Sequence, residues 1–512
     1  MLSLCCSELN IKENGMNASE KHTRISRLLA SVSLPIWTIG LLAIVYLLVL
    51  SQNPTLDAYS YAYGAIVGGD ELLMPHHLLY NVWGYALVRI FAFTGAEQLT
   101  ILQISNIVMS VGCLLITKKI LKTIGASDKF TAASLLFCGS CWVFLRFVSD
   151  NECYIMPLFF SLGALYYAID IKQNWLKSVL CACISILFHQ IGVLVYLPIM
   201  CMILLNKELP FNVFVRSLAV SLIVPIVYVF ATYWQTGSAA VSSVVSFVSH
   251  DYLSGSADAP DLWQCFSLGI INTFRAFFQM HGYVLSLLKT HWFVMLPLVV
   301  LVASLLIMAF VSLFRMPKSK VSVKTCGFKC CVIAVLTLTI VFSFFSNGKA
   351  EFMYILPFMA VMLLTMCTKI DARQMAFVAV AVFVWNVSVG AVPYHFCRMN
   401  GYSQTAEAVH DHLDSRFLLG NAQWVENIYC YRYRSVPGNL IGIHLYSDSL
   451  YRADTSAHVT IYTDCFGGHN AISRASILKV GFPDFLNESQ TDSTLLRFEN
   501  FFSKYEIRRL KY

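Results

Sequence analysis

Residues 28–50 decide the fold class, with the sequence LLASVSLPIWTIGLLAIVYLLVL. The run carries no charged side chain and is long enough to cross a bilayer core of about 30 Å, which takes about 20 helical residues. Further apolar runs of about 17 to 25 residues follow it along the chain. They are continuous and lack the alternating pattern of barrel strands, so they predict membrane-spanning helices.

Composition supports the same fold class. The chain has 512 residues, of which 57% are hydrophobic and only 13% are charged. Soluble domains carry about 25% charged residues, so a cytosolic globular enzyme and a disordered protein are excluded. Most of the 17 cysteines lie in apolar runs, which excludes a disulfide-stapled secreted domain. The sequence predicts an all-α polytopic membrane protein with about 10 to 12 transmembrane helices.

Basic residues between the apolar runs predict the orientation. The polar and basic residues 1–27 precede the first run, and such a flank keeps an N-terminus in the cytoplasm. Later basic clusters are expected on the same side: 118–129, 172–177, Lys207, 315–329 and 369–373. Polar stretches with few basic residues alternate with them and are expected outside: 51–75, 148–153, 235–262, 347–351 and all residues after Val392.

Three segments leave the number of spans open. His77–Phe93 is apolar enough to cross, but a full crossing would place the 118–129 cluster outside, so a half-crossing or juxtamembrane helix is the alternative. Residues 176–205 form one long helix or two short helices that turn near His189. Residues 266–288 include ionisable side chains and are a candidate for a helix that lies flat on the surface.

The composition changes after Pro393. Residues 394–512 contain an amphipathic stretch, Ser403–Phe417, and strand-like runs at Leu440–Leu445 and Val459–Tyr462. About 120 residues suffice for a small mixed domain. We therefore predict three parts: a cytoplasmic N-terminal segment 1–27, a transmembrane domain 28–392 and a non-cytoplasmic C-terminal α/β domain 393–512.

Acidic residues near the ends of spans are candidates for catalysis, because an ionisable group at membrane depth costs about 3 kcal/mol or more. Asp57 follows the first span, where an apolar boundary raises a carboxyl pKa and suits a general base. Asp150 and Glu152 stand with Arg146 in a dense polar loop that could orient an acceptor or hold a divalent cation. The structural alternatives are an interfacial helix cap for Asp57 and a solvated loop for the other three.

Cationic and imidazole side chains gather on the same predicted side. His76 and His77 open an apolar helix, whose positive N-terminal end suits a phosphate. Lys349 is the only basic residue of its outer loop, so it can pair with a phosphate or form a surface pair with Glu351. His189 lies in an apolar segment, where a hydrogen-bonded structural role is the alternative to a role in a site.

The arrangement of these residues resembles the GT-C superfamily, polytopic glycosyltransferases that use polyprenyl-phosphate-linked sugars. Asp57 is similar to their first-loop acid, and Asp150 and Glu152 are similar to their second acidic motif. Lys349 to Tyr354 stands where such proteins often carry Arg-Tyr, and Pro75 to Tyr80 resembles the start of their following helix. The resemblance covers residues 28–392, with a lysine in place of the usual arginine and one acid in place of a pair.

The resemblance implies an inverting transfer of a sugar, of hexosyltransferase type, from a polyprenyl-phosphate donor to a glycan, lipid or protein acceptor. Asp57 is then the base, with Asp150 and Glu152 as further catalytic residues. The donor phosphate would be bound by Lys349, His76, His77 and Tyr354. Contacts to the acceptor, or structural polar roles, fall to Arg146, His189 and Glu351. No metal ligands are assigned and no cofactor is required, although Asp150 and Glu152 could bind a divalent cation.

Other functions stay open at this point. Leu187 to Gln190 is similar to EpsG-like and Wzy-type polysaccharide polymerases. A transporter would place ionisable groups within the spans and often show inverted repeats, and a non-catalytic membrane scaffold is a further alternative. We expect a multi-pass protein of the bacterial inner membrane that acts on cell-envelope polysaccharide, with membrane lipids, the donor and the acceptor as partners, and no nucleic acid.

Overall fold

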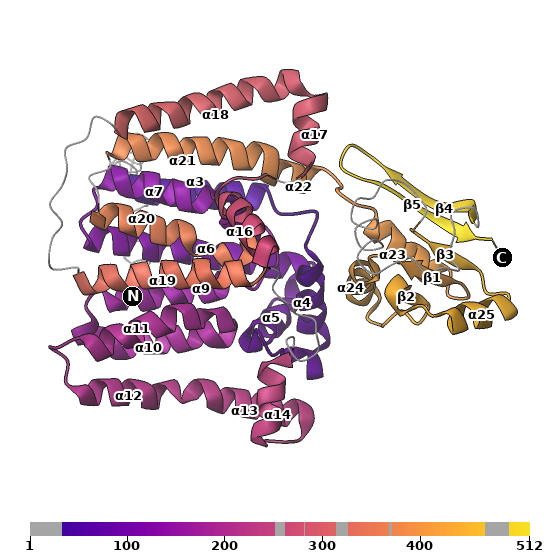
Figure 1. The fold of residues 1–512 in the computed structure, drawn as a ribbon, viewed down its shortest axis with the longest axis horizontal. Coiled ribbons are helices and arrows are strands. Elements are labelled where there is room, and N and C mark those ends of the chain that lie inside the picture. Colours follow the sequence, from indigo (N-terminus) through magenta and orange to yellow (C-terminus); the bar gives the residue numbers. More distant parts are fainter. Residues whose placement is uncertain are drawn as a thin grey trace, which may run out of the picture.

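The computed structural model describes residues 33–250, 262–280, 282–313, 326–367, 371–465 and 491–511. Within this part of the chain, long helices lie side by side in a bundle, and a smaller region with strands lies beside one end of the bundle (Figure 1). The predicted all-α membrane protein with a small C-terminal α/β region is confirmed. The predicted segment 1–27 lies outside the described residues, as do Arg315, Lys318, Lys320, Lys324, Lys369 and His281.

The first half of the bundle follows the predicted apolar runs. Local signals set several helix ends: the Ser127 side chain, for example, accepts a hydrogen bond from the Phe130 amide and starts a helix. The helices are α3 (Leu34–Leu48), α4 (Leu56–Val67), α5 (Leu78–Ile90), α6 (Gln98–Thr123), α7 (Asp128–Ser140), α8 (Trp142–Val148), α9 (Ile155–Ala168), α10 (Ile171–Phe188), α11 (Val193–Leu205), α12 (Phe211–Ser221), α13 (Ile223–Thr236) and α14 (Val241–Val248).

The second half continues in the same way. A capping box between Asp371 and Gln374 starts α21, and a π-helical turn, Val387–Ala391, links it to the short helix α22. The helices are α16 (Leu262–Phe277), α17 (Gly282–Thr290), α18 (Trp292–Leu313), α19 (Cys326–Phe345), the 3-10 turn η6 (Ala350–Met353), α20 (Leu356–Cys367), α21 (Ala372–Asn386) and α22 (Val392–Phe396).

Helix length and composition identify the candidate membrane spans. Six helices among the described residues are long and apolar enough to cross a bilayer, or seven if the bent pair α7 and α8 is one span. Shorter apolar helices, including Leu34–Leu48, Ile155–Ala168 and Gln190–Leu205, lie alongside them in the bundle (Figure 1). The protein is therefore an integral multi-pass membrane protein, and the expected number of about 10 to 12 crossings stays a prediction.

The structure excludes one alternative for two of the ambiguous segments. In the segment His77–Phe93 the chain forms only α5, which packs with α4 at the end of the bundle that faces the strands (Figure 1). With 13 residues it is not a full-length crossing helix, and the half-crossing and juxtamembrane alternatives both stay predictions. Residues 176–205 form two helices, α10 and α11, with the break at His189, whose backbone is extended.

The segment 266–288 also differs from one flat helix. It divides between α16 and α17, and α16 contacts α8, α19 and the η6 turn. Its Asn272 side chain donates a hydrogen bond to the Gly348 carbonyl at 2.7 Å. The helix α16 therefore serves as a support for the loop that carries Lys349.

The C-terminal region is a small α/β unit built on five strands in the order β2-β1-β3-β5-β4. β1 pairs in parallel with β2 and β3, whereas β5 pairs antiparallel with β3 and β4. Its elements are α23 (Tyr402–Asp411), β1 (Arg416–Leu419), α24 (Ala422–Tyr433), β2 (Leu440–Gly442), α25 (Asp448–Ser456), β3 (Ile461–Thr463), β4 (Thr491–Glu499) and β5 (Lys504–Leu510).

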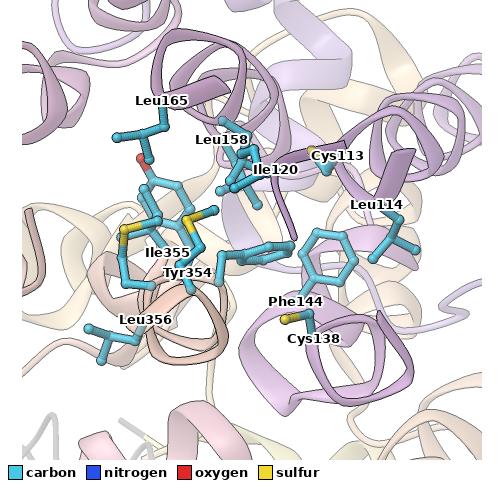
Figure 2. Packing of buried hydrophobic residues seen from close by; sticks show 14 of the residues in the cluster. Cys113, Leu114, Ile120, Cys138, Phe144, Leu158, Leu165, Tyr354, Ile355 and Leu356 are labelled. Atoms are coloured by element: carbon cyan, nitrogen blue, oxygen red, sulfur yellow. The ribbon is translucent and has the colours of Figure 1, made fainter. Parts of the chain in front are cut away.

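The main hydrophobic core fills the centre of the helical bundle. Buried side chains of α6, α7, α8, α9 and α20 meet there, and Figure 2 shows Phe144 and Leu158 packed near Tyr354. Phe144 lies edge-on to Phe358, with ring centroids 5.2 Å apart. This core fixes the helix ends from which the candidate site residues project.

Candidate active site

The buried ion pair of Arg146 and Asp150 anchors the loop between α3 and α4. Arg146 Nη1 lies 2.8 Å from Asp150 Oδ2, and the Asp150 side chain is wholly buried. The same oxygen accepts a hydrogen bond from the Thr55 amide at 2.9 Å, and Oδ1 accepts one from the Asn151 amide at 2.8 Å. Both oxygens of Asp150 are thus engaged by protein donors, which gives this carboxylate a structural function.

Thr55 connects this anchor to the first helix of the site. Its side chain caps α4 by accepting a hydrogen bond from the Ala58 amide at 3.1 Å. Its hydroxyl also donates to Glu152 Oε1 at 2.5 Å. Asp57 lies in the first turn of α4, so the cap and the loop anchor together determine where its carboxylate projects.

Asp57 lies close to Glu152 and Lys349, and these three side chains form the site that is called the recess below. The Asp57 side chain is exposed to water, yet protein atoms surround it closely enough that burial raises its pKa, while the charge of Lys349 acts in the opposite direction. The two observations are compatible for a carboxylate that water reaches from one side only. The electrostatic effect of Lys349 also shows that residues far apart in the sequence meet here.

Glu152 shares this recess with Asp57. It is 4% exposed, and burial raises its pKa well above the usual range, as do the negative charges of Asp57 and Asp150. Two carboxylates in one low-dielectric site cannot both ionise easily, so this arrangement favours the protonated form of one of them. The buried Glu152 is the better proton holder, because Asp57 has water and Lys349 to stabilise its charge.

Lys349 projects from the short loop before η6. Its side chain is 56% exposed, and its ammonium lies 3.9 Å from Glu351 Oε1. Gly348, the preceding residue, has a positive φ of 66° and packs against α16 so closely that a Cβ there would lie 2.4 Å from the Gly269 nitrogen. This close contact fixes the base of the Lys349 side chain while its end stays in water.

Histidine and tyrosine rings form another wall of the recess. The rings of Tyr61 and His77 are 4.8 Å apart, and those of Tyr154 and His189 are stacked at 5.2 Å. Burial and the neighbouring histidines lower the pKa of His189 to about 3. Its Nδ1 accepts a hydrogen bond from the Ile191 amide, which leaves the proton of the neutral ring on Nε2. His189 is therefore a neutral wall residue.

The two remaining phosphate-binding candidates occupy different positions. His76 Nδ1 lies 3.1 Å from Gln190 Oε1, which joins the start of α5 to the turn after α10. Tyr354 is 2% exposed and packs within the bundle core beside Ile355 and Leu356 (Figure 2). In this arrangement Tyr354 supports the recess from behind, with its ring 5.8 Å from that of Tyr154.

Sequence reasoning missed the residues that hold the site together. Asn106 is buried within α6, and its side-chain amide donates to the carbonyls of Asp150 at 2.9 Å and Glu152 at 2.8 Å. Gln103, one turn earlier, donates to the Ser51 carbonyl at 3.1 Å. An amide within an apolar run is costly unless it is hydrogen-bonded, so this pair at a spacing of three was the available signal.

The arrangement of the acidic side chains bears on whether a divalent cation could bind. Among the described residues, no group of three or more His, Cys, Asp or Glu side chains is placed to hold a metal ion. Asp150, one of the two carboxylates suggested for a divalent cation, already accepts hydrogen bonds at both oxygens.

Comparison with known proteins gives structural similarities only. No model of a protein family matches the chain, and no curated protein matches it in sequence. The chain is similar to the solved structure of the Archaeoglobus fulgidus oligosaccharyltransferase in complex with Zn and sulfate, with a TM-score of 0.48 and 10% identity over 91% of this chain and 72% of that chain.

Two further solved structures show the same level of similarity. AglB from Archaeoglobus fulgidus, in complex with an inhibitory peptide and a dolichol-phosphate, has a TM-score of 0.45 and 10% identity over 84% of this chain and 69% of that chain. ArnT from Cupriavidus metallidurans, bound to undecaprenyl phosphate, has a TM-score of 0.39 and 10% identity over 93% and 97%. AglB and ArnT are GT-C glycosyltransferases, and at these scores the likeness carries no argument on activity.

Proposed function

We propose that this protein is a GT-C-type glycosyltransferase that transfers a sugar from a polyprenyl-phosphate donor to an acceptor hydroxyl or amide. The observation that carries the proposal is the placement of Asp57 near Glu152 and Lys349. Thr55, which caps the helix that carries Asp57, donates a hydrogen bond to Glu152 at 2.5 Å. Burial raises the pKa of Asp57, and the charge of Lys349, which lies 3.9 Å from Glu351, lowers it. A carboxylate that can take a proton, beside a cation that can receive a phosphate charge, is the pair that such a transfer needs.

The proposed reaction inverts the anomeric carbon. The acceptor atom attacks the anomeric carbon while the bond from that carbon to the phosphate oxygen breaks, and the electron pair leaves with the polyprenyl phosphate. Asp57 takes the acceptor proton as general base. The ammonium of Lys349 stabilises the charge that develops on the leaving phosphate. A protonated Glu152 would leave Asp57 as the carboxylate beside the acceptor, while Glu351 pairs with Lys349.

The other candidate residues position these groups. Arg146 and Asp150 hold the loop that leads into α4, and we assign neither of them a contact with substrate. His76 and His77, at the start of α5, remain proposed donors of hydrogen bonds to the phosphate. Tyr354 supports the aromatic wall from the core.

The proposal also includes the orientation and the division of the chain. We place the recess and the C-terminal residues 393–512 on the non-cytoplasmic face, the transmembrane domain at 28–392 and the segment 1–27 in the cytoplasm. A bacterial inner membrane is the proposed location, because the basic clusters then lie inside. A divalent cation stays a proposal for Glu152 alone, since Asp150 is occupied.

Replacement of the base tests this function. In a deletion strain complemented with the Asp57→Asn variant, we expect the polyprenyl-phosphate sugar to accumulate as it does in the uncomplemented strain, measured by mass spectrometry of extracted lipids. The matched control is Asp70→Asn, an acid of the same outer loop that lies on the exposed η2 turn (Gly69–Leu72). Normal lipid-linked sugar levels in an expressed Asp57→Asn strain would remove the base assignment.

A further inference from the structure

A second cavity lies between the membrane bundle and the C-terminal α/β region. It has a volume of about 410 Å³, within the range of roughly 300–1,000 Å³ that is usual for ligand pockets. The bundle contributes the loop after α3, Tyr59 of α4 and the start of α6, and the α/β region contributes α23 and α24. Asp57 and Lys349 are not among the lining residues, so this cavity is separate from the recess.

Hydrogen bonds across the interface hold the two walls of the cavity in place. The Asn427 side chain of α24 donates to the Leu56 carbonyl at 3.1 Å, and the Tyr431 hydroxyl donates to Glu97 at 2.9 Å. On the other side, the Asn53 side chain donates to the Tyr394 carbonyl at 2.8 Å. The cavity is therefore formed before any ligand enters, which lowers the entropic cost of binding.

Aromatic rings and hydrogen-bonding groups both line this cavity. Trp424 is half-buried and stacks on Tyr402 with ring centroids 5.4 Å apart, so part of its indole remains open. Gln404 and Glu407 project from α23, and Arg432 of α24 pairs with Glu407 at 2.5 Å. Together these side chains offer donors, acceptors and an apolar ring face.

The charges of the lining residues indicate which class of ligand this cavity can bind. Two arginines, Arg398 and Arg432, line the cavity together with two glutamates, Glu97 and Glu407, so the formal charges cancel. An anionic phosphate or sulfated ligand would meet two carboxylates, and an acyl chain would leave the polar groups without partners. A neutral ligand with many hydroxyl groups and some apolar faces matches this lining.

We propose that this cavity binds a neutral saccharide and holds the acceptor glycan of the transfer reaction. Saccharide binding stands on the cavity itself, whereas the acceptor role rests on the proposed function. Tyr59 of the cavity and Asp57 of the recess are two positions apart on α4, so they project about 200° apart around a helix about 10 Å wide. A chain of several sugar units, and not a monosaccharide, is needed to occupy both places.

The direct test is binding without a donor. The full chain in lipid nanodiscs is applied to an array of neutral oligosaccharides, and the affinity for the best one is then measured by calorimetry. We expect Gln404→Ala and Glu407→Gln to weaken binding about tenfold or more, because the first removes a hydrogen-bonding amide and the second replaces the carboxylate that accepts hydrogen bonds and pairs with Arg432. The matched controls are Gln423→Ala and Asp411→Asn, exposed residues of the same two helices that do not line it.

Each outcome decides the proposal. Absence of binding to every neutral oligosaccharide, or binding that the cavity variants do not weaken, overturns it, as does binding of an acidic glycan or a peptide in the same cavity. Thermal unfolding of each variant shows whether it is folded. If the protein binds a saccharide but the Asp57→Asn variant has normal activity, the proposed base is refuted while the proposed saccharide site stands. Loss of saccharide binding in the cavity variants with sugar transfer intact would keep the binding site and refute its role in holding the acceptor.

Discussion

Asp57 and Glu152 lie in one site, but their surroundings shift the pKa values of the two carboxyl groups differently. Burial raises the pKa of both carboxyl groups. The negative charges of Asp57 and Asp150 raise the pKa of Glu152 further, whereas the positive charge of Lys349 lowers the pKa of Asp57. The acid beside the cation and water is the one to ionise first, and the acid in the protein interior keeps its proton. This difference supports the proposal that Asp57 is the base.

The cation should therefore control the pH dependence of activity. Asp57 is active as a base only when ionised, so activity is present above its pKa and is lost as the pH falls through it. Lys349→Met removes the charge that lowers this pKa, and the acidic limb of the kcat/KM profile should move to higher pH. We also expect a loss of about 100-fold in kcat, as for other stabilisers of a developing anion.

The control for this measurement is Lys289→Met, an exposed lysine of α17. Its profile should match that of the wild type. An acidic limb that stays in place in the Lys349→Met enzyme would mean that Lys349 does not act on the group that titrates.

Asp150 should matter for stability more than for chemistry. Its carboxylate is wholly buried against Arg146, so Asp150→Asn leaves a buried guanidinium without its counter-charge, at a cost of about 3–5 kcal/mol in the free energy of unfolding. Thermal unfolding of the purified protein measures the loss. The control is Asp128→Asn, whose pair with Lys122 is exposed and worth at most about 1 kcal/mol. Equal melting temperatures for the two variants would contradict the anchoring function.

At the scale of elements, the close contact of Gly348 with α16 determines the position of the loop that carries Lys349. Gly348 has a positive φ and lies against Gly269 of α16, and the Gly348 carbonyl is hydrogen-bonded to Asn272. Gly348→Ala would place a Cβ 2.4 Å from the Gly269 nitrogen, so the loop must move. A shift of about 1 Å in a positioned group can cost about 100-fold in rate, and we expect a loss of at least tenfold in sugar transfer.

Gly327→Ala provides the comparison for this loop variant, because a Cβ at Gly327 in α19 would meet no atom within 4 Å. That variant should transfer sugar at the wild-type rate. Wild-type activity in Gly348→Ala would show that the loop position is not needed.

The sequence predicts helices and strands best where the pattern of hydrophobic residues alone determines them. Helix α3 lies within the run 28–50, the strand-like run Leu440–Leu445 contains β2, and the run Val459–Tyr462 overlaps β3. The break at His189 could only be left open, because a local pattern does not reveal that the ring stacks on Tyr154 from another helix. Likewise, the burial of Tyr354 depends on how α20 packs, which the spacing of residues near Lys349 does not contain.

At the scale of the whole molecule, the short helices α4 and α5 explain how the fold is compatible with the alternation of basic and non-basic loops along the sequence. Both are short and lie at the end of the bundle that faces the strands (Figure 1). The chain therefore enters α6 at the end where Tyr431 of the α/β region contacts Glu97, and leaves α6 at the cluster of Lys118, Lys119 and Lys122. An apolar segment that does not cross restores the alternation of basic and non-basic loops.

Two insertion sites on either side of α6 test this arrangement. With 26 residues, α6 is roughly 39 Å long, more than the bilayer core of about 30 Å. Gly95 and Gly125 flank it, and a Cβ at either position would meet no atom within 4 Å, so both loops can accept a short epitope tag. In intact spheroplasts we expect an antibody to reach the tag after Gly95 but not the tag after Gly125, until detergent opens the membrane.

The result bears directly on the chemistry. Because Glu97 contacts the α/β region, whose Asn427 also contacts α4, the Gly95 tag reports the side on which Asp57 lies. A tag after Gly95 that is protected while the one after Gly125 is reached would place Asp57 and Lys349 in the cytoplasm, where no outward-facing lipid-linked donor is present. Tags that share one side would mean that α6 does not cross, and the orientation derived from the basic clusters would then be wrong.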